Sequence, residues 1–184
     1  MLEKFFSMEY AQRAELFEGL RIWKYKEYRE IQGTYPVIFL SFANVKENTY
    51  EQARESICRI IQELYNKNIF LLHTDLLTDN EKEEYKQIST KMNDSMISDA
   101  IRKMSDYLSR YYGKKTIILL DEYDTPIQEA YVGGFWPDLM GVLRSLLNST
   151  FKTNPYLERA IMTGITRVSK ESIFSDLNNL EVVT

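Results

Sequence analysis

The chain has 184 residues, of which 23 are Lys or Arg and 27 are Asp or Glu, so its formal net charge is −4. This length suffices for one domain with a substantial core, and the slight acidic balance gives no general attraction to nucleic acids. Direct nucleic-acid binding is therefore not expected. One cysteine and one histidine exclude an internal disulfide and argue against a zinc site.

Apolar runs in this sequence are short. None approaches the roughly 18 residues that span a bilayer, and the N-terminus has no signal-peptide pattern. We therefore expect no membrane association and a cytoplasmic location. Cys58 falls on the apolar side of a helical pattern, which favours a buried thiol that packs like a small hydrophobe over a catalytic or redox cysteine.

Residues 1–32 show a helical spacing of apolar side chains. Within them, Trp23-Lys24-Tyr25-Lys26 interleaves aromatic and basic residues. Such interleaving occurs in single-strand nucleic-acid binding, but at helical spacing it is more typical of an amphipathic face. We therefore expect a structural role for it.

Three continuous apolar runs follow along the chain, at Val37–Leu40, Ile117–Leu120 and Ala160–Met162. Their lack of alternation predicts parallel strands that are buried on both faces. Helical stripes separate the strands, with Thr49 as the expected N-cap of the first and a start near Ser95 for the second. These stripes cover Tyr50–Leu64, Ile97–Tyr111 and Phe135–Phe151, and a charged segment, Asp79–Lys91, predicts a solvated helix.

Strands separated by helices indicate an α/β layered fold with right-handed crossovers. About 75 residues separate the first two strands, whereas a crossover needs only about ten to twelve. The sequence therefore predicts a helical insertion between them, in a chain that reads as one unit.

Two adjacent carboxylates, Asp121 and Glu122, follow the second strand directly. The carboxyl edge of a parallel sheet is where ligands bind in open α/β folds, and neighbouring acids repel unless a cation or hydrogen bonds compensate. Asp121 would hold Mg²⁺ through a coordinated water, and Glu122 would polarise the water that attacks a γ-phosphate. The alternative is that these acids cap the helix that begins at Pro126.

The third strand leads into the polar sequence Thr163-Gly164-Ile165-Thr166-Arg167 at the same edge. Thr163 is the candidate for sensing the γ-phosphate or orienting the attacking water, and Arg167 could offer its charge to a phosphate. As alternatives, Thr163 simply ends a strand and Arg167 is a surface cation.

Long stretches of the chain resemble the AAA-ATPase-like family of bacterial proteins, which are predicted to bind ATP. The resemblance rests on LLDEYDTPIQEAYVGG from Leu119 to Gly134, FKTNPYLERAIMTGITRVSKESIF from Phe151 to Phe174, and SDLNNLEV from Ser175 to Val182. LFEGLRI and PVIFLSF, earlier in the chain, agree with it. The resemblance implies ATP and Mg²⁺ as ligands, Asp121 and Glu122 as Walker B acids, and Thr163 at the sensor position.

The family's phosphate-binding loop should precede the helix that contains MLEKFF, yet G-x-x-x-x-G-K-[ST] does not occur in the chain. Gly113-Lys114-Lys115-Thr116 imitates its end but precedes a strand, so we expect a turn there. The resemblance thus implies that residues 1–184 form one partial domain, without the Walker A loop and without the nuclease-like domain that often follows in the family.

Related P-loop ATPases order their strands 5-1-4-3-2. By that analogy the strands here are 2, 3 and 4, in a contiguous 4-3-2 sheet with flanking helices. Strand 4 would then present an open edge, through which we expect self-association unless C-terminal residues cover it.

The expected function is that of a fragment of an ATP-hydrolysing protein, carrying Walker B and sensor residues but unable to hold or hydrolyse ATP alone. The alternative is a non-catalytic module for regulation or protein interaction. A role in nucleic-acid processing is suggested only by the family's nuclease-like domain.

Overall fold

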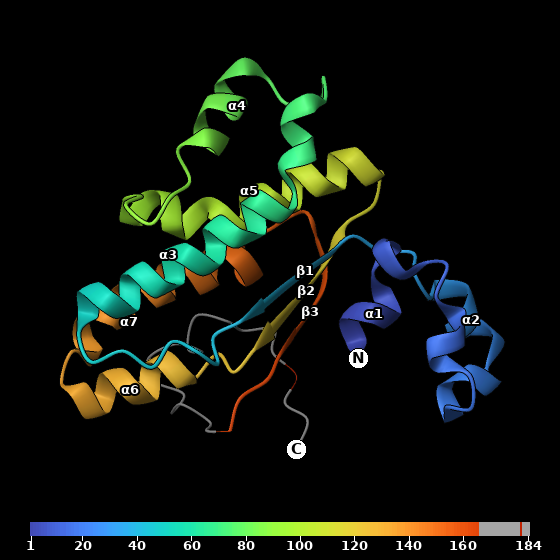
Figure 1. The fold of residues 1–184 in the computed structure, drawn as a ribbon, viewed down its shortest axis with the longest axis horizontal. Coiled ribbons are helices and arrows are strands. Elements are labelled where there is room, and N and C mark those ends of the chain that lie inside the picture. The colour runs from blue at the N-terminus through green and yellow to red at the C-terminus, as the bar shows by residue number, and fades with distance from the viewer. Residues whose placement is uncertain (166–180, 182–184) are drawn as a thin grey trace.

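A three-stranded parallel sheet forms the centre of the computed structural model, which describes residues 1–165 and 181. The strands are β1 (Val37–Ser41), β2 (Thr116–Asp121) and β3 (Leu157–Met162), in the order β1-β2-β3 (Figure 1). All three expected strands are therefore present and contiguous, and the fold is α/β.

The chain between β1 and β2 forms the expected helical insertion, with α3 (Tyr50–Lys67), α4 (Asp79–Lys86) and α5 (Asp94–Tyr112). Thr49 caps α3 as predicted, and α5 begins at Asp94, next to the predicted start near Ser95, with Asn93 as its N-cap. No helix in the described part of the chain combines the length and apolar character needed to cross a membrane.

Two further helices connect β2 to β3, namely α6 (Thr125–Gly133) and α7 (Trp136–Leu147), and a π-helical turn, Asn148–Lys152, continues α7. Each helix has a proline in its first turn, where the missing N–H group breaks no intrahelical bond. α7 buries six side chains: Leu139, Met140, Val142, Leu143, Leu146 and Leu147.

The core lies on one face of the sheet. Ile38, Leu40, Ile118 and Leu120 belong to one buried cluster with side chains of α3, α5 and α7, and Figure 1 shows these three helices together on one side of the strands. Burying this apolar surface is the main stabilising contribution to the fold.

Burial on both faces, which the continuous apolar runs predicted, holds only for β2. Its residues from Thr116 to Leu120 are all buried, because strands flank it on both sides. In β1 the side chain of Phe39 is 43% exposed, and in β3 the residues Glu158–Ile161 are exposed. The prediction was wrong for the two outer strands because a run of apolar residues does not reveal whether a second layer covers them.

The charged helix α4 is more than the solvated helix that was predicted. The side chain of Tyr85 is buried, and its hydroxyl donates a 2.6 Å hydrogen bond to the carbonyl of Tyr65 in α3. The Tyr65 hydroxyl in turn donates to the carbonyl of Ala100 in α5 at 2.8 Å. Two tyrosine hydroxyls thus link the three helices of the insertion.

The N-terminal segment is less helical than predicted. It contains two short α-helices, α1 (Leu2–Phe6) and α2 (Lys26–Ile31), separated by three 3₁₀ turns. Aromatic packing holds it together, with the rings of Phe5 and Phe17 in an edge-to-face contact at 5.2 Å. Trp23 lies against Phe17, which agrees with a structural role for this residue.

Candidate functional site

The carboxyl edge of the sheet brings together residues from all three strands. Asp121 ends β2, its register partner Ser41 ends β1, and Thr163 directly follows β3. The N–H group of Phe42 donates to the Asp121 carbonyl at 2.9 Å, which fixes the backbone of Asp121 against the first strand. The side chain of Asp121 is half-buried.

Thr163 contacts Asp121 directly. Its hydroxyl donates a 2.5 Å hydrogen bond to Oδ1 of the Asp121 carboxylate. Its backbone continues the ladder beyond β3, because its N–H group donates to the Leu120 carbonyl at 2.9 Å and its carbonyl accepts from the Tyr123 N–H at 3.1 Å. The two sequence-predicted residues are therefore adjacent, and three hydrogen bonds hold Thr163 beside the end of β2.

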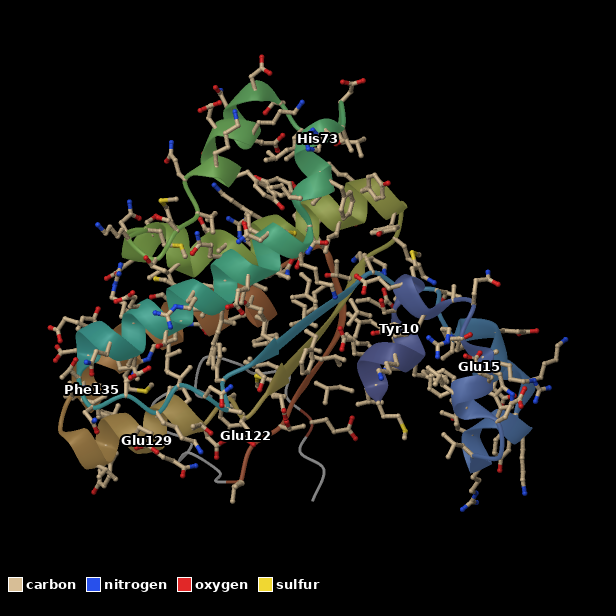
Figure 2. All side chains as sticks on the ribbon, in the orientation of Figure 1. Tyr10, Glu15, His73, Glu122, Glu129 and Phe135 are labelled. Carbon is tan, nitrogen blue, oxygen red and sulfur yellow. The ribbon has the colours of Figure 1, made fainter. Side chains whose placement is uncertain are left out.

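Glu122 turns the chain away from the sheet. Its φ of 50° is the only positive φ of a non-glycine residue in the described part of the chain. Such a conformation costs about 1–3 kcal/mol in a non-glycine residue and persists only where the surroundings impose it. The Glu122 carboxylate accepts a 3.1 Å hydrogen bond from the Thr125 hydroxyl, and Figure 2 shows Glu122 at the end of the sheet beside the start of α6.

The alternative interpretation, in which these acids cap α6, predicts hydrogen bonds from the helix backbone to their carboxylates, and the described residues show none. The N-cap position belongs to Asp124, whose carboxylate makes no capping bond to the helix backbone. The partner of Glu122 is the side chain of Thr125 rather than a helix N–H group. In the described part of the chain, neither acid therefore makes a capping hydrogen bond to the α6 backbone, although Glu122 lies close to the start of that helix.

Asp124 occupies a different environment from the two acids before it. Its side chain is only 1% exposed, and Oδ2 accepts a 2.9 Å hydrogen bond from the Gln128 side chain. Gly164 packs against it so closely that a Cβ atom on Gly164 would lie 2.5 Å from Asp124 Oδ1. The sequence interpretation gave no role to Gly164 and none to the Thr125 hydroxyl; a glycine two residues after the strand was the only local signal.

The remaining predictions concern Arg167 and possible phosphate or metal ligands. Arg167 lies outside the described residues. Over residues 1–165 and 181, no group of three or more His, Cys, Asp or Glu side chains is suited to hold a metal ion, so the prediction of a single carboxylate binding Mg²⁺ through water stays a prediction.

The phosphate-loop imitation is a turn, as expected. Gly113 ends α5 in a left-handed conformation, and Thr116 begins β2. The Lys114 ammonium group lies 3.6 Å from the centre of the Tyr35 ring and donates to the Thr34 hydroxyl at 3.1 Å. This lysine is at the amino end of β2, whereas Asp121 is at the carboxyl end.

Comparison with known proteins gives one family and one distant relative. A family described as "Predicted AAA-ATPase" matches residues 1–174. An uncharacterized protein in the vnfD 5′ region of Azotobacter chroococcum mcd 1 is 24% identical over 182 residues, which cover 95% of this chain and 30% of the relative. The chain thus spans less than a third of that relative's length. No solved structure matches this chain.

Proposed function

The chain belongs to the predicted AAA-ATPase family, and on that premise we propose that it supplies the acidic half of a site that hydrolyses ATP with Mg²⁺. The observation that carries the proposal is the hydrogen bond between Thr163 and Asp121 at the carboxyl edge of a parallel sheet. Ligands of open α/β sheets bind at this edge.

The proposed roles divide between the two adjacent acids. Asp121 holds the Mg²⁺ ion through a coordinated water, since a hard cation prefers carboxylate oxygen and retains much of its hydration shell. Glu122 acts as the general base that polarises the attacking water. Its constrained backbone supports this role, because a strained conformation at a polar residue is often part of a functional site.

Thr163 is proposed to sense the γ-phosphate or to orient the attacking water. Thr163 is an exposed residue at the sheet edge, and its hydroxyl contacts the carboxylate of Asp121. A hydroxyl both donates and accepts hydrogen bonds, so a phosphate or water could bind it without breaking the contact. Arg167, four residues later in the sequence, is proposed to stabilise phosphate charge.

The groups that cradle the phosphates are proposed to come from polypeptide other than residues 1–184, since no G-x-x-x-x-G-K-[ST] sequence occurs among them. In this proposal the three strands correspond to strands 2, 3 and 4 of a P-loop NTPase sheet. That correspondence is an analogy, which the parallel order β1-β2-β3 supports.

The test is ATP hydrolysis by the protein encoded by the complete gene, with Glu122→Gln compared with Glu129→Gln. Glu129 lies farther along α6, as Figure 2 shows, and serves as a matched control. We expect Glu122→Gln to lower kcat by about 100-fold or more, as loss of a general base does, and Glu129→Gln to retain activity. Equal activity in both variants would exclude Glu122 as the base.

A non-catalytic module for regulation or protein interaction is the second candidate. The observation that favours it is the absence of the phosphate-loop sequence from a chain that otherwise matches the family. One result separates the two candidates. If the protein is non-catalytic, the product of the complete gene shows no Mg²⁺-dependent ATP hydrolysis, and Glu122→Gln leaves that unchanged.

Self-association through β3 is a further part of the proposal. Among the described residues, β3 pairs with β2 on one side and has no strand on the other, and its central residues are exposed. An uncovered edge strand carries backbone groups that can pair with a second chain. We propose that a second copy pairs there.

A further inference from the structure

Gly164, in the loop after β3, packs closely against the loop after β2. A Cβ atom built on Gly164 would lie 2.5 Å from Asp124 Oδ1 and 2.7 Å from Cε1 of the Tyr123 ring. Carbon atoms of real side chains do not come this close to their neighbours. The backbone of Gly164 therefore fits against Asp124 and Tyr123 only because it has no side chain.

Both residues that Gly164 contacts are buried and fixed. Tyr123 is 8% exposed and Asp124 is 1% exposed. The Asp124 carboxylate accepts from the Gln128 side chain, one turn further along α6, at 2.9 Å. This hydrogen bond holds the buried Asp124 carboxylate against α6, where the loop after β3 packs on it.

The contact lies next to the hydrogen bonds that place Thr163. The Tyr123 N–H group donates to the Thr163 carbonyl at 3.1 Å, and the Thr163 N–H group donates to the Leu120 carbonyl at 2.9 Å. Any displacement of Gly164 moves its chain neighbour Thr163, whose hydroxyl reaches Asp121. The packing of Gly164 is thus coupled to the contact between Thr163 and Asp121.

We propose that Asp124 and Gly164 are positioning residues, which hold the Thr163 hydroxyl on the Asp121 carboxylate by packing the two loops together. Asp124, although it belongs to the same run of acids as Asp121 and Glu122, serves the packing and not the Mg²⁺ ion or the attacking water. The functional consequence of this positioning rests on the proposed function, whereas the packing itself can be tested without nucleotide.

The experiment measures amide hydrogen exchange and the Thr163 methyl resonance by NMR in residues 1–184, in Gly164→Ala and in Gly141→Ala. Gly141, in α7, is the matched control because a Cβ atom there would meet no atom within 4 Å. In Gly164→Ala we expect the amides of Tyr123 and Thr163 to exchange about tenfold faster or more, as overpacking of this size displaces a loop, and the Thr163 methyl signal to shift. The Phe42 amide, which bonds to Asp121 from the other side, should keep its rate.

A double variant separates positioning from general loss of stability. Asp124→Ala combined with Gly164→Ala removes the nearest atom that the new methyl group meets. Adding Gly164→Ala to Asp124→Ala should therefore change the Thr163 exchange rate less than it does in the wild-type background.

Unchanged exchange at Tyr123 and Thr163 in Gly164→Ala would overturn the proposal. So would an equal acceleration of the Phe42 amide, which would indicate general destabilisation of the sheet edge. Failure of the proposed function is a separate outcome. It is read from the hydrolysis assay on Glu122→Gln, and these exchange rates do not depend on its result.

Discussion

The hydroxyl of Thr163 donates a 2.5 Å hydrogen bond to the carboxylate of Asp121, although 42 positions separate the two residues in the chain. The contact exists because β2 and β3 are parallel neighbours whose carboxyl ends meet at one edge of the sheet. Asp121 therefore presents a carboxylate that is already oriented by a neighbouring strand.

This contact predicts a difference between two substitutions of Thr163. Thr163→Val keeps the shape of the side chain but removes the donor, and Thr163→Ser keeps the hydroxyl. In the hydrolysis assay on the product of the complete gene, we expect Thr163→Val to lower kcat roughly tenfold or more, since loss of orientation affects the reacting geometry. Thr163→Ser should retain most of the activity. Equal rates for both variants would remove Thr163 from the mechanism.

The absence of a phosphate-loop sequence predicts the behaviour of residues 1–184 alone. Walker B acids without loop N–H groups, the loop lysine and its hydroxyl cannot hold a triphosphate, so we expect very weak binding of Mg·ATP and no hydrolysis. Isothermal titration calorimetry is the measurement. Micromolar affinity for Mg·ATP would contradict this expectation and would require a different phosphate site within the chain.

The edge of β3, on which no strand of the described residues lies, predicts self-association that a single proline prevents. The Thr163 N–H group points toward β2, so the alternation of the parallel ladder turns the Ala160 N–H group outward. Ala160→Pro removes an outward donor and no ladder bond, which edge strands tolerate. Sedimentation velocity should show concentration-dependent dimers for the wild-type chain and for Ala160→Ser, and monomers for Ala160→Pro. A wild-type chain that stays monomeric would exclude pairing through this edge.

The contact between α4 and α3 predicts a measurable contribution to stability. Tyr85→Phe removes a buried hydroxyl that donates to the Tyr65 carbonyl at 2.6 Å, and we expect the free energy of unfolding to fall by about 1 kcal/mol. Tyr111→Phe is the control, because Tyr111 is exposed. Urea denaturation compares the three proteins, and similar midpoints for Tyr85→Phe and wild type would show that α4 contributes nothing through this bond.

The hydrogen bonds of Glu81 in α4 predict that the stability of this helix depends on pH. Burial opposes its charged form, but hydrogen bonds from Thr78 and Arg110 outweigh burial and lower the pKa of the Glu81 carboxyl. Because the folded-state pKa is below the unfolded one, the stabilisation is complete above about pH 4.3, the ordinary value for Glu. It is lost as the pH falls through the lower folded pKa.

The amide side chain introduced by Glu81→Gln can still accept from the Thr78 N–H group, so this change removes only the charge that pairs with Arg110. We therefore expect Glu81→Gln to be less stable than wild type at pH 7 by about 0.5 kcal/mol, and the difference to shrink below pH ~4. Glu83→Gln is the control, since the Glu83 side chain is 67% exposed in its pair with Lys86. Thermal unfolding followed by circular dichroism across this pH range measures both. A difference for Glu81→Gln that persists unchanged in acid would show that the charge of Glu81 is not the cause.

By itself, the sequence determined the order and type of the main elements. The apolar runs at residues 37–40, 117–120 and 160–162 lie within the three strands, and the 3.6-residue stripes marked α3, α5 and α7. These features were predictable because period and turn chemistry act between residues close in the chain. The same reasoning placed Asp121 and Glu122 after a buried strand, where acids need an explanation.

Only the tertiary structure decided how these pieces meet. It brought the Thr163 hydroxyl to the Asp121 carboxylate, gave Glu122 a left-handed backbone, and fitted Gly164 against Asp124. It also left Phe39 exposed on an outer strand that its apolar run had placed in the core. Contacts of this kind depend on which strands are neighbours and on what covers each face, and the local pattern of residues determines neither.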